Sequence, residues 1–125
     1  MAKLSESKKL IGQWGEDQAC EYLRRKGWKI LGRNYTCRFG EIDVIASKRG
    51  CLAFVEVKLR RNAEFAEARE FVDQRKQERL RTAALSWLSE NDTGLQPRFD
   101  VIEIYGTPGT DFRDLTIRHY ENAFE

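Results

Sequence analysis

Apolar side chains recur at helical spacing in two stretches of the chain and cluster into shorter, strand-like runs elsewhere. The helical spacing predicts one helix from about Ser7 to Lys26, stopped by Gly27, and a second from about Arg69 to Ser89. The shorter runs predict strands at 28–35, 41–48, 51–58, 98–105 and 115–120. Residues 60–68 show no strong period and predict a loop, and 98–105 is apolar on both faces, as in a central strand covered by helices.

The connector between the second and third strands predicts an antiparallel hairpin, because it is short and holds glycine where a tight turn needs a positive φ. If residues 49–50 form the turn, Asp43 lies directly across from Glu56. If residues 48–49 form it, Asp43 pairs with Phe54 and is a diagonal neighbour of Glu56. Both registers put the two carboxylates on one face of the hairpin.

Asp43, Glu56 and Lys58 interrupt strands that otherwise read as buried, and strand alternation places Lys58 on the same face as Glu56. Charged side chains rarely occupy such positions unless they are paired or bound to a metal. Two facing carboxylates repel each other, and a divalent cation would reverse that effect. The alternative is a half-exposed hairpin whose polar face also holds Glu41, and spacing alone leaves both interpretations open.

Length and composition are typical of one compact domain over residues 1–125. The chain has 41% hydrophobic and 34% charged residues, no apolar run long enough for a membrane helix, and no signal-peptide core, so we expect a cytoplasmic protein without membrane contact. The three cysteines lack zinc-knuckle spacing and predict reduced thiols. Neither a P-loop nor a dinucleotide glycine motif is present, which argues against nucleotide-cofactor chemistry.

Positive charge is concentrated between residues 24 and 61. This block holds eleven lysines and arginines against Glu41, Asp43 and Glu56, a net charge of +8 in a chain whose total is +2. Such a block is the usual electrostatic footprint of nucleic-acid binding, although a solvated charged face is the commoner explanation of any charge run. The candidates for contacts with nucleic acid are Arg38, Lys48, Arg60, Arg61 and, on the second helix, Lys76.

Four further polar residues have alternative interpretations. Glu16 is at the edge of the first helix's apolar stripe, one turn from the small residues Gly12 and Cys20, so it either approaches the sheet or remains a solvated glutamate. Lys76 falls on the stripe of the second helix, and extension along the apolar surface is favoured over a phosphate or site contact. Asp100 is interpreted as a capping or ion-pairing residue rather than a metal ligand, and His119 is not expected to be catalytic.

The order of these residues resembles the PD-(D/E)XK nuclease superfamily: Glu16 on a helix, then Asp43, then Glu56-Val57-Lys58, then a helix and a strand. The block Gly40-Glu41-Ile42-Asp43 with Phe54-Val55-Glu56-Val57-Lys58 is more specific, and over nearly the whole chain it resembles the small bacterial YraN-like family. Ile42 stands where the superfamily's name has proline, and Ala66 where this family is expected to have glycine.

The resemblance implies an α/β (α+β) fold with a restriction-endonuclease-like core, a central mixed sheet of about five strands and helices on both faces. It assigns Mg²⁺ or Mn²⁺ binding to Asp43, Glu56 and the carbonyl of Val57, with Glu16 as a further catalytic residue by analogy with Holliday junction resolvases. Lys58 is implied to orient the attacking water or to stabilise charge at phosphorus, and beside two carboxylates it is expected to stay protonated. Glu41 is given low weight as a ligand.

Three functions follow as hypotheses. The first is a metal-dependent DNA endonuclease, acting on branched or damaged DNA and assembled as a symmetric dimer because a junction offers two equivalent strands. The second is a nucleic-acid-binding module of the same fold that does not cut. The third is a protein-interaction scaffold, for which the hints are apolar Phe65, Phe71 and Phe112 in or near loops.

Overall fold

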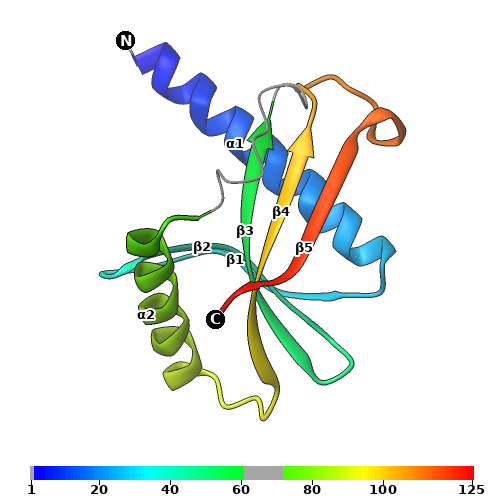
Figure 1. Ribbon diagram of the computed structural model, residues 1–125. Coiled ribbons are helices and arrows are strands. Elements are labelled where there is room, and N and C mark those ends of the chain that lie inside the picture. The colour runs from blue at the N-terminus through cyan, green and yellow to red at the C-terminus, as the bar shows by residue number, and fades with distance from the viewer. Residues whose placement is uncertain (1, 61–71) are drawn as a thin grey trace.

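The computed structural model describes the backbone of residues 2–60 and 72–125, with side chains from residue 9 onward. The elements follow in the predicted order helix, three strands, helix, two strands, with a short 3₁₀ helix (Phe112–Asp114) before the last strand (Figure 1). Their bounds are α1 (Ala2–Arg25), β1 (Lys29–Cys37), β2 (Gly40–Lys48), β3 (Cys51–Arg60), α2 (Gln74–Glu90), β4 (Gln96–Tyr105) and β5 (Thr116–Phe124).

The five strands form one mixed sheet in the order β1-β2-β3-β4-β5. All neighbouring strands are antiparallel except β3 and β4, which are parallel and are connected through α2. A parallel pair needs a long crossover, and here that crossover contains α2. The predicted α+β class with a central mixed sheet of about five strands is confirmed.

The two helices cover opposite faces of the sheet. Along β3, Ala53 and Val55 pack in a core with Leu23 of α1, whereas Leu52 and Phe54 pack in a second core with α2. The ring of Phe54 meets that of Trp87 edge to face, with 5.8 Å between their centroids. Because β3 alternates apolar side chains between two covered faces, it reads as a continuous hydrophobic run, as does β4.

The observed ends of several helices and strands differ from the predicted ones. Helix α1 begins before the predicted Ser7 and ends as predicted, with Gly27 at φ 92° and the N–H of Trp28 donating to the carbonyl of Leu23. Helix α2 begins at Gln74 rather than Arg69, because the Asp73 side chain accepts from the N–H of Lys76 and caps the helix there. Most of the predicted loop at 60–68 lies outside the described residues, and β5 extends beyond the predicted Tyr120.

The hairpin turn is formed by Arg49 and Gly50, whose φ angles are 48° and 79°. Lys48 therefore pairs with Cys51, and of the two registers considered above the one with the turn at 49–50 is confirmed. The ladder between β2 and β3 nevertheless ends at the pair Val44 and Val55. Beyond this pair, β2 curves away from β3 toward α2 (Figure 1), so that the sheet opens just before Asp43 and Glu56 would meet.

The pleat of β2 is also interrupted at Asp43. Ile42 packs in the core beneath α2 and Val44 in the core beneath α1, although strict alternation would place them on one face. On the neighbouring strand, Asn34 stands opposite Asp43 and has a φ of 51°, an uncommon value for any residue but glycine. The irregularity of both strands puts Asp43 at the opening, where it is partly buried and lines a hollow beside α2.

Two whole-chain expectations concern thiols and membranes. The cysteines are free, with Cys20 buried and Cys37 and Cys51 partly buried, as expected for reduced thiols. Among the helices in the described part of the chain, none combines the length and the apolar character needed to span a bilayer.

Candidate functional site

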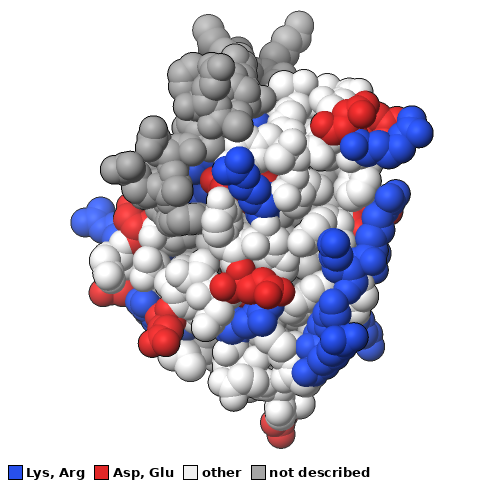
Figure 2. All heavy atoms as spheres, turned by 45° about the vertical axis from the view of Figure 1, so that its right-hand side comes forward, with Lys and Arg blue, Asp and Glu red and all other residues white. Residues whose placement is uncertain are grey.

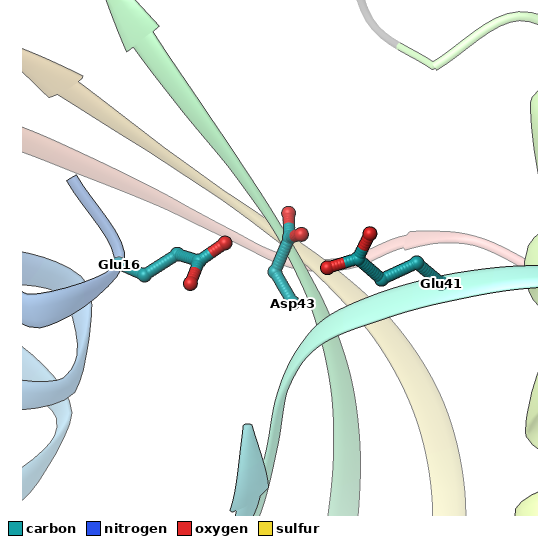
Figure 3. A group of neighbouring side chains, drawn as sticks. All are labelled: Glu16, Glu41 and Asp43. Atoms are coloured by element: carbon teal, nitrogen blue, oxygen red, sulfur yellow. The ribbon is translucent and has the colours of Figure 1, made fainter. Parts of the chain in front are cut away.

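Three carboxylates converge at the opening of the sheet. Glu16 extends from α1 toward Asp43, and Glu41 approaches Asp43 from the other side (Figure 3). Each side chain offers an oxygen within 4.8 Å of an oxygen of the other two. Within the described residues this is the group whose donor atoms are spaced to hold a metal ion, and two of its three members, Glu16 and Asp43, were predicted from the sequence.

Glu16 reaches the sheet because α1 packs closely on β3 one residue earlier. Gly15 is buried, and a Cβ at that position would lie 3.7 Å from the Cβ of Leu59. A methyl group there would be in ordinary van der Waals contact with Leu59, so α1 and β3 lie close together at this point. The expected close approach therefore occurs, but at Gly15 rather than through Gly12, around which there is open space.

Of the three carboxyl groups, that of Asp43 has the pKa that departs most from its ordinary value. One of its oxygens accepts a hydrogen bond of 2.8 Å from the N–H of Val57. Burial, followed by the charge of Glu56 and then by those of Glu16 and Glu41, raises the pKa of Asp43 to about 7, and the Val57 hydrogen bond only partly opposes this. Near neutral pH this carboxyl group therefore either retains a proton or needs a cation.

The pKa of Glu16 is also raised. Burial raises its pKa, while a hydrogen bond from Asn34 and the charge of Arg33 act against the rise. The guanidinium of Arg33 is 3.9 Å from the Glu16 carboxylate but is held more closely by Asp17, at 2.6 Å. Beside Glu16 and Glu41 lies an open hollow of about 430 Å³, large enough for water and a ligand group to reach both carboxylates.

Glu56 faces α2 rather than the three-carboxylate group. It is only 6% exposed, and its carboxylate forms an ion pair of 2.6 Å with the Nζ of Lys76. Both residues line a second hollow of about 290 Å³ together with Asp43 and Arg79. Extension of Lys76 along the apolar surface was favoured from the sequence; instead its ammonium group contacts the site.

Lys58 follows Glu56 on the same side of β3 and is partly buried. Burial, together with the charge of Lys76, lowers its pKa from the ordinary value, and the opposing effect of Glu56 is smaller. Burial and Lys76 thus outweigh the neighbouring carboxylates, and the expected protonation of Lys58 stays a prediction. The group of Val57 that contacts the site is its N–H, which donates to Asp43.

The predicted basic surface is divided among several places. Lys48 contacts the carbonyl of Lys26, Arg60 lies 3.4 Å from buried Glu103, and Arg38 lies over the ring of Phe39. Arg61 lies outside the described residues. In the view turned toward β5, basic side chains gather down the right-hand side, and charged side chains of both signs also stand near the middle (Figure 2). The block of +8 is thus not one continuous patch beside the carboxylates.

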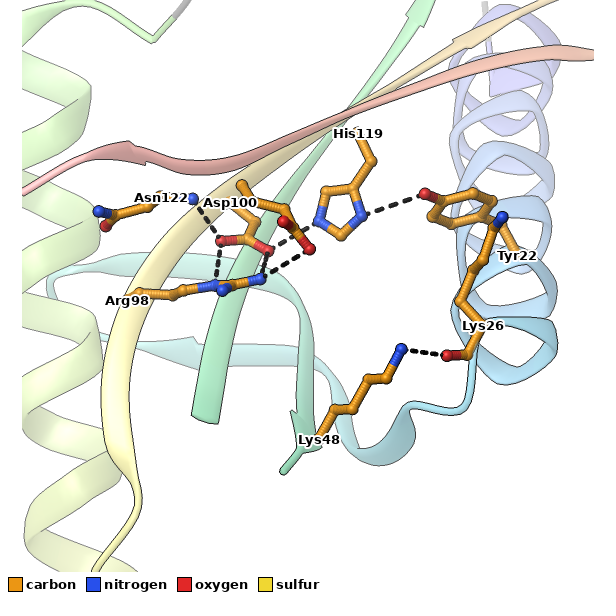
Figure 4. Close-up of polar contacts among 8 residues, drawn as sticks. Tyr22, Lys26, Lys48, Arg98, Asp100, His119 and Asn122 are labelled. Carbon is orange, nitrogen blue, oxygen red and sulfur yellow. Dashed lines mark hydrogen bonds and ion pairs between the residues drawn. The ribbon is translucent and has the colours of Figure 1, made fainter. Parts of the chain in front are cut away.

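A second buried aspartate, Asp100, has a different environment. Its carboxylate accepts two hydrogen bonds from Arg98, at 2.9 and 3.0 Å, and one from the N–H of Asn122, and it bonds to His119 Nε2 at 2.7 Å (Figure 4). Burial alone would raise its pKa, but the hydrogen bonds from His119 and Arg98 hold the pKa below its usual value. Asp100 is therefore an ion-pairing residue, as expected, and His119 is its partner.

Sequence reasoning gave too little weight to Glu41 and did not single out Asn34 or Arg79. Glu41 had a usable signal, because strand alternation already placed it beside Asp43. Asn34 carries no such signal, since its role depends on a left-handed φ opposite Asp43. Arg79 lines the second hollow only because the turn between β1 and β2 rests against α2.

The fold and site define an α+β protein with acidic side chains gathered where its sheet opens. Residues 15–104 match the model of the family described as "Uncharacterised protein family UPF0102". The chain is 42% identical over 123 residues to a UPF0102 protein of Pelotomaculum thermopropionicum, a match that covers 97% of this chain and 100% of the relative. It is 39% identical to one of Trichlorobacter lovleyi, over 100% of this chain and 98% of the relative, and 45% identical to one of Nocardia farcinica, over 82% and 81%. The chain belongs to the UPF0102 family.

Proposed function

We propose that this protein is a metal-dependent phosphodiesterase of the PD-(D/E)XK type that cleaves DNA internally, at branched or damaged sites. The observation that carries the proposal is the convergence of Glu16, Glu41 and Asp43 within 4.8 Å of one another, beside Glu56 and Lys58. Their order along the chain supports the superfamily assignment. Like charges gathered in a partly buried position are unfavourable unless a cation joins them.

The donor set fits a hard divalent cation. All candidate ligands are carboxylate oxygens, which suit Mg²⁺ or Mn²⁺, and Mg²⁺ commonly takes one or two protein carboxylates while keeping several waters. Asp43 is the central ligand because it neighbours Glu16, Glu41 and Glu56. When bound, the metal would supply Lewis-acid polarisation of the phosphate and a more acidic water.

The protein's own residues have separate roles in this proposal. The N–H of Val57 fixes the orientation of Asp43 through its 2.8 Å hydrogen bond. Glu16, on the α1 side, borders the larger hollow and is placed to accept a hydrogen bond from a water there. Lys58 lies near Glu56 and provides positive charge toward the non-bridging phosphate oxygens.

The proposal is tested with purified protein on branched and linear DNA in Mg²⁺ or Mn²⁺. Asp43→Asn and Lys58→Ala are expected to reduce cleavage at least about 100-fold, since metal and charge stabilisation supply several kcal/mol. Asp92→Asn and Lys29→Ala are matched controls on exposed positions and should cut like the wild type. Equal cutting by all four variants would contradict the proposal.

The ion pair between Lys76 and Glu56 favours a second candidate, a nucleic-acid-binding module that does not cut. In this arrangement a lysine of the protein already neutralises one carboxylate of the site. Salt-dependent DNA binding that is unchanged in Asp43→Asn, with no cleavage of any substrate, would favour this module over the nuclease. A symmetric dimer remains a prediction of the nuclease hypothesis, and sedimentation with and without junction DNA tests it.

A further inference from the structure

We propose that the hollow between the β1–β2 turn and the first two turns of α2 binds an unpaired nucleotide, with Phe39 as the residue on which its base stacks. The inference rests on the proposed function and adds a substrate class to it. The preferred substrate is a nucleic acid that is single-stranded immediately beside the phosphodiester held at the carboxylates, as at a flap, a gap or a fork.

The location follows from two hollows that share one wall. The first, of about 290 Å³, contains Asp43 and Glu56 and extends to Arg79. The second has the same volume of about 290 Å³ and extends from Arg79 to Phe39. A chain whose phosphodiester lies at the carboxylates therefore reaches Phe39 by passing Arg79, without crossing another element of the described structure.

Phe39 is suited to stack on a base. It is 42% exposed, at the tip of the turn between β1 and β2, whereas most aromatic rings of the described residues are packed in the cores. The guanidinium of Arg38 lies 5.1 Å from the centre of its ring. An exposed ring with an adjacent arginine is the combination that single-strand-binding surfaces use for base and backbone.

The turn that carries Phe39 is fixed against α2. Gly40 has a φ of 152°, which a residue with a side chain rarely adopts, and a Cβ there would lie 3.7 Å from the Cβ of Arg79. The turn and the helix thus approach each other through a residue without a side chain. Gly40 and Arg79 line one hollow, and Phe39 and Arg79 line the next, so Phe39 borders the proposed nucleotide site.

The charge and the shape of the hollow favour an unpaired nucleotide over an amphipathic peptide or a base within a duplex. Arg75 and Arg79 line the hollow with one acid, Glu78, so the wall attracts phosphate. Phe39 is its one aromatic lining residue, which offers too little apolar surface for an amphipathic peptide. Bases within a duplex are already stacked on each other, and only an unpaired base presents a face to a side chain.

The test compares binding of an overhang and a fully paired duplex of equal length, each labelled with 2-aminopurine, at low salt without divalent metal. In the overhang the 2-aminopurine is the first unpaired base. Phe39→Ala is expected to weaken overhang binding at least about fivefold, to leave duplex binding unchanged, and to abolish the change in 2-aminopurine fluorescence. Phe39→Trp should preserve all three signals. Leu85→Ala removes an even more exposed apolar residue, on α2, and should change none of them.

The outcomes separate this inference from the proposed function. If Phe39→Ala weakens both DNAs equally, or neither, Phe39 does not stack on an unpaired base and the inference is overturned, even where wild-type protein cleaves DNA. If binding depends on Phe39 as expected but no DNA is cut in Mg²⁺ or Mn²⁺, the nucleotide site stands and the nuclease proposal fails. Absence of any binding by the wild type overturns the inference, and cleavage in Mg²⁺ or Mn²⁺ decides the nuclease proposal separately.

Discussion

Two aspartates on the same sheet, the partly buried Asp43 and the fully buried Asp100, have opposite surroundings. Asp100 is fully buried, and arginine, histidine and a backbone N–H surround its carboxylate. Asp43 accepts one hydrogen bond from the backbone, and the charges that act on it are those of other carboxylates. The pKa of Asp100 accordingly falls below its ordinary value, and burial with the charge of Glu56 raises that of Asp43 to about 7.

This difference separates a structural acid from a candidate functional one. A buried charge with a complete set of partners is stable without any ligand, and its removal leaves those partners unsatisfied. A buried charge among like charges is stabilised only when a proton or a cation arrives. Burial alone therefore does not identify the functional aspartate. The charges of the groups around each carboxylate distinguish the two.

The largest effect is expected for Asp100→Asn. The substitution preserves shape but leaves Arg98 and His119 without their carboxylate, so the free energy of unfolding should fall by about 3–5 kcal/mol. Urea denaturation at pH 7 measures it. Asp111→Asn, at an exposed aspartate that also pairs with an arginine, is the control and should change stability far less. Similar values for the two variants would remove the distinction drawn for Asp100.

The same substitution at Asp43 should have the opposite sign. At pH 8 the wild-type carboxyl is ionised among other acids, whereas asparagine is neutral and retains an oxygen for the N–H of Val57. We expect Asp43→Asn to raise the free energy of unfolding by about 1–3 kcal/mol, in metal-free buffer. A loss of stability at pH 8 would mean that Asp43 is structural.

The pH dependence sharpens this result. Because the pKa of Asp43 is higher in the folded protein, the folded state binds more protons between about pH 4 and pH 7, and the contribution of Asp43 to stability declines as pH rises through that range. Asp43→Asn should remove this decline. Asp100 acts in the other direction: its pKa is lowered on folding, so its contribution is lost only as pH falls below about 4. Unfolding at several pH values tests both.

A smaller effect is expected on adding Mg²⁺ or Mn²⁺. A cation at ten times its dissociation constant should stabilise the wild type by about 1.4 kcal/mol. Asp43→Asn should lose this stabilisation, and Asp100→Asn should keep it despite its lower starting stability. Thermal melting with and without metal gives the comparison, and an equal shift in both variants would place the cation elsewhere.

The smallest effect is expected for Lys76→Gln. The lysine side chain is 46% exposed, so loss of its ion pair with Glu56 should lower stability by less than about 1 kcal/mol without metal. With metal, the variant should bind the cation more tightly, because the ammonium no longer competes for Glu56. Titration calorimetry on both proteins measures the change, with Lys29→Gln as an exposed control.

The fold could be predicted where local rules and tertiary structure agree. Glycine at position 50 and the short connector predicted an antiparallel hairpin with its turn at 49–50 or 48–49, and the structure has the first of these two registers. The start of α2 was harder to predict. Apolar residues continue at helical spacing upstream of Asp73, whereas the cap at which the helix begins depends on one side chain, that of Asp73. Local pattern thus predicted the elements better than their ends.

The candidate site could be predicted only in part. Spacing indicated Asp43, Glu56 and Lys58, and the family resemblance added Glu16. Neither showed that the ladder ends at Val44 and Val55, or that Glu56 beside Asp43 is paired with Lys76. Where a strand leaves its neighbour depends on packing from both helices, and that information is not local to the strand.

The divergence of β2 from β3 also creates an aggregation problem, and Asp43 lies where that problem arises. A strand whose neighbour departs exposes backbone groups that can pair with another chain. The N–H of Val57 is such a group, and the Asp43 carboxylate takes the place of the missing strand by accepting its hydrogen bond. Charged side chains are a common means of protecting strand edges. The residue proposed to hold the metal thus also protects the edge of β3, so protein stored without metal has this edge covered by a carboxylate.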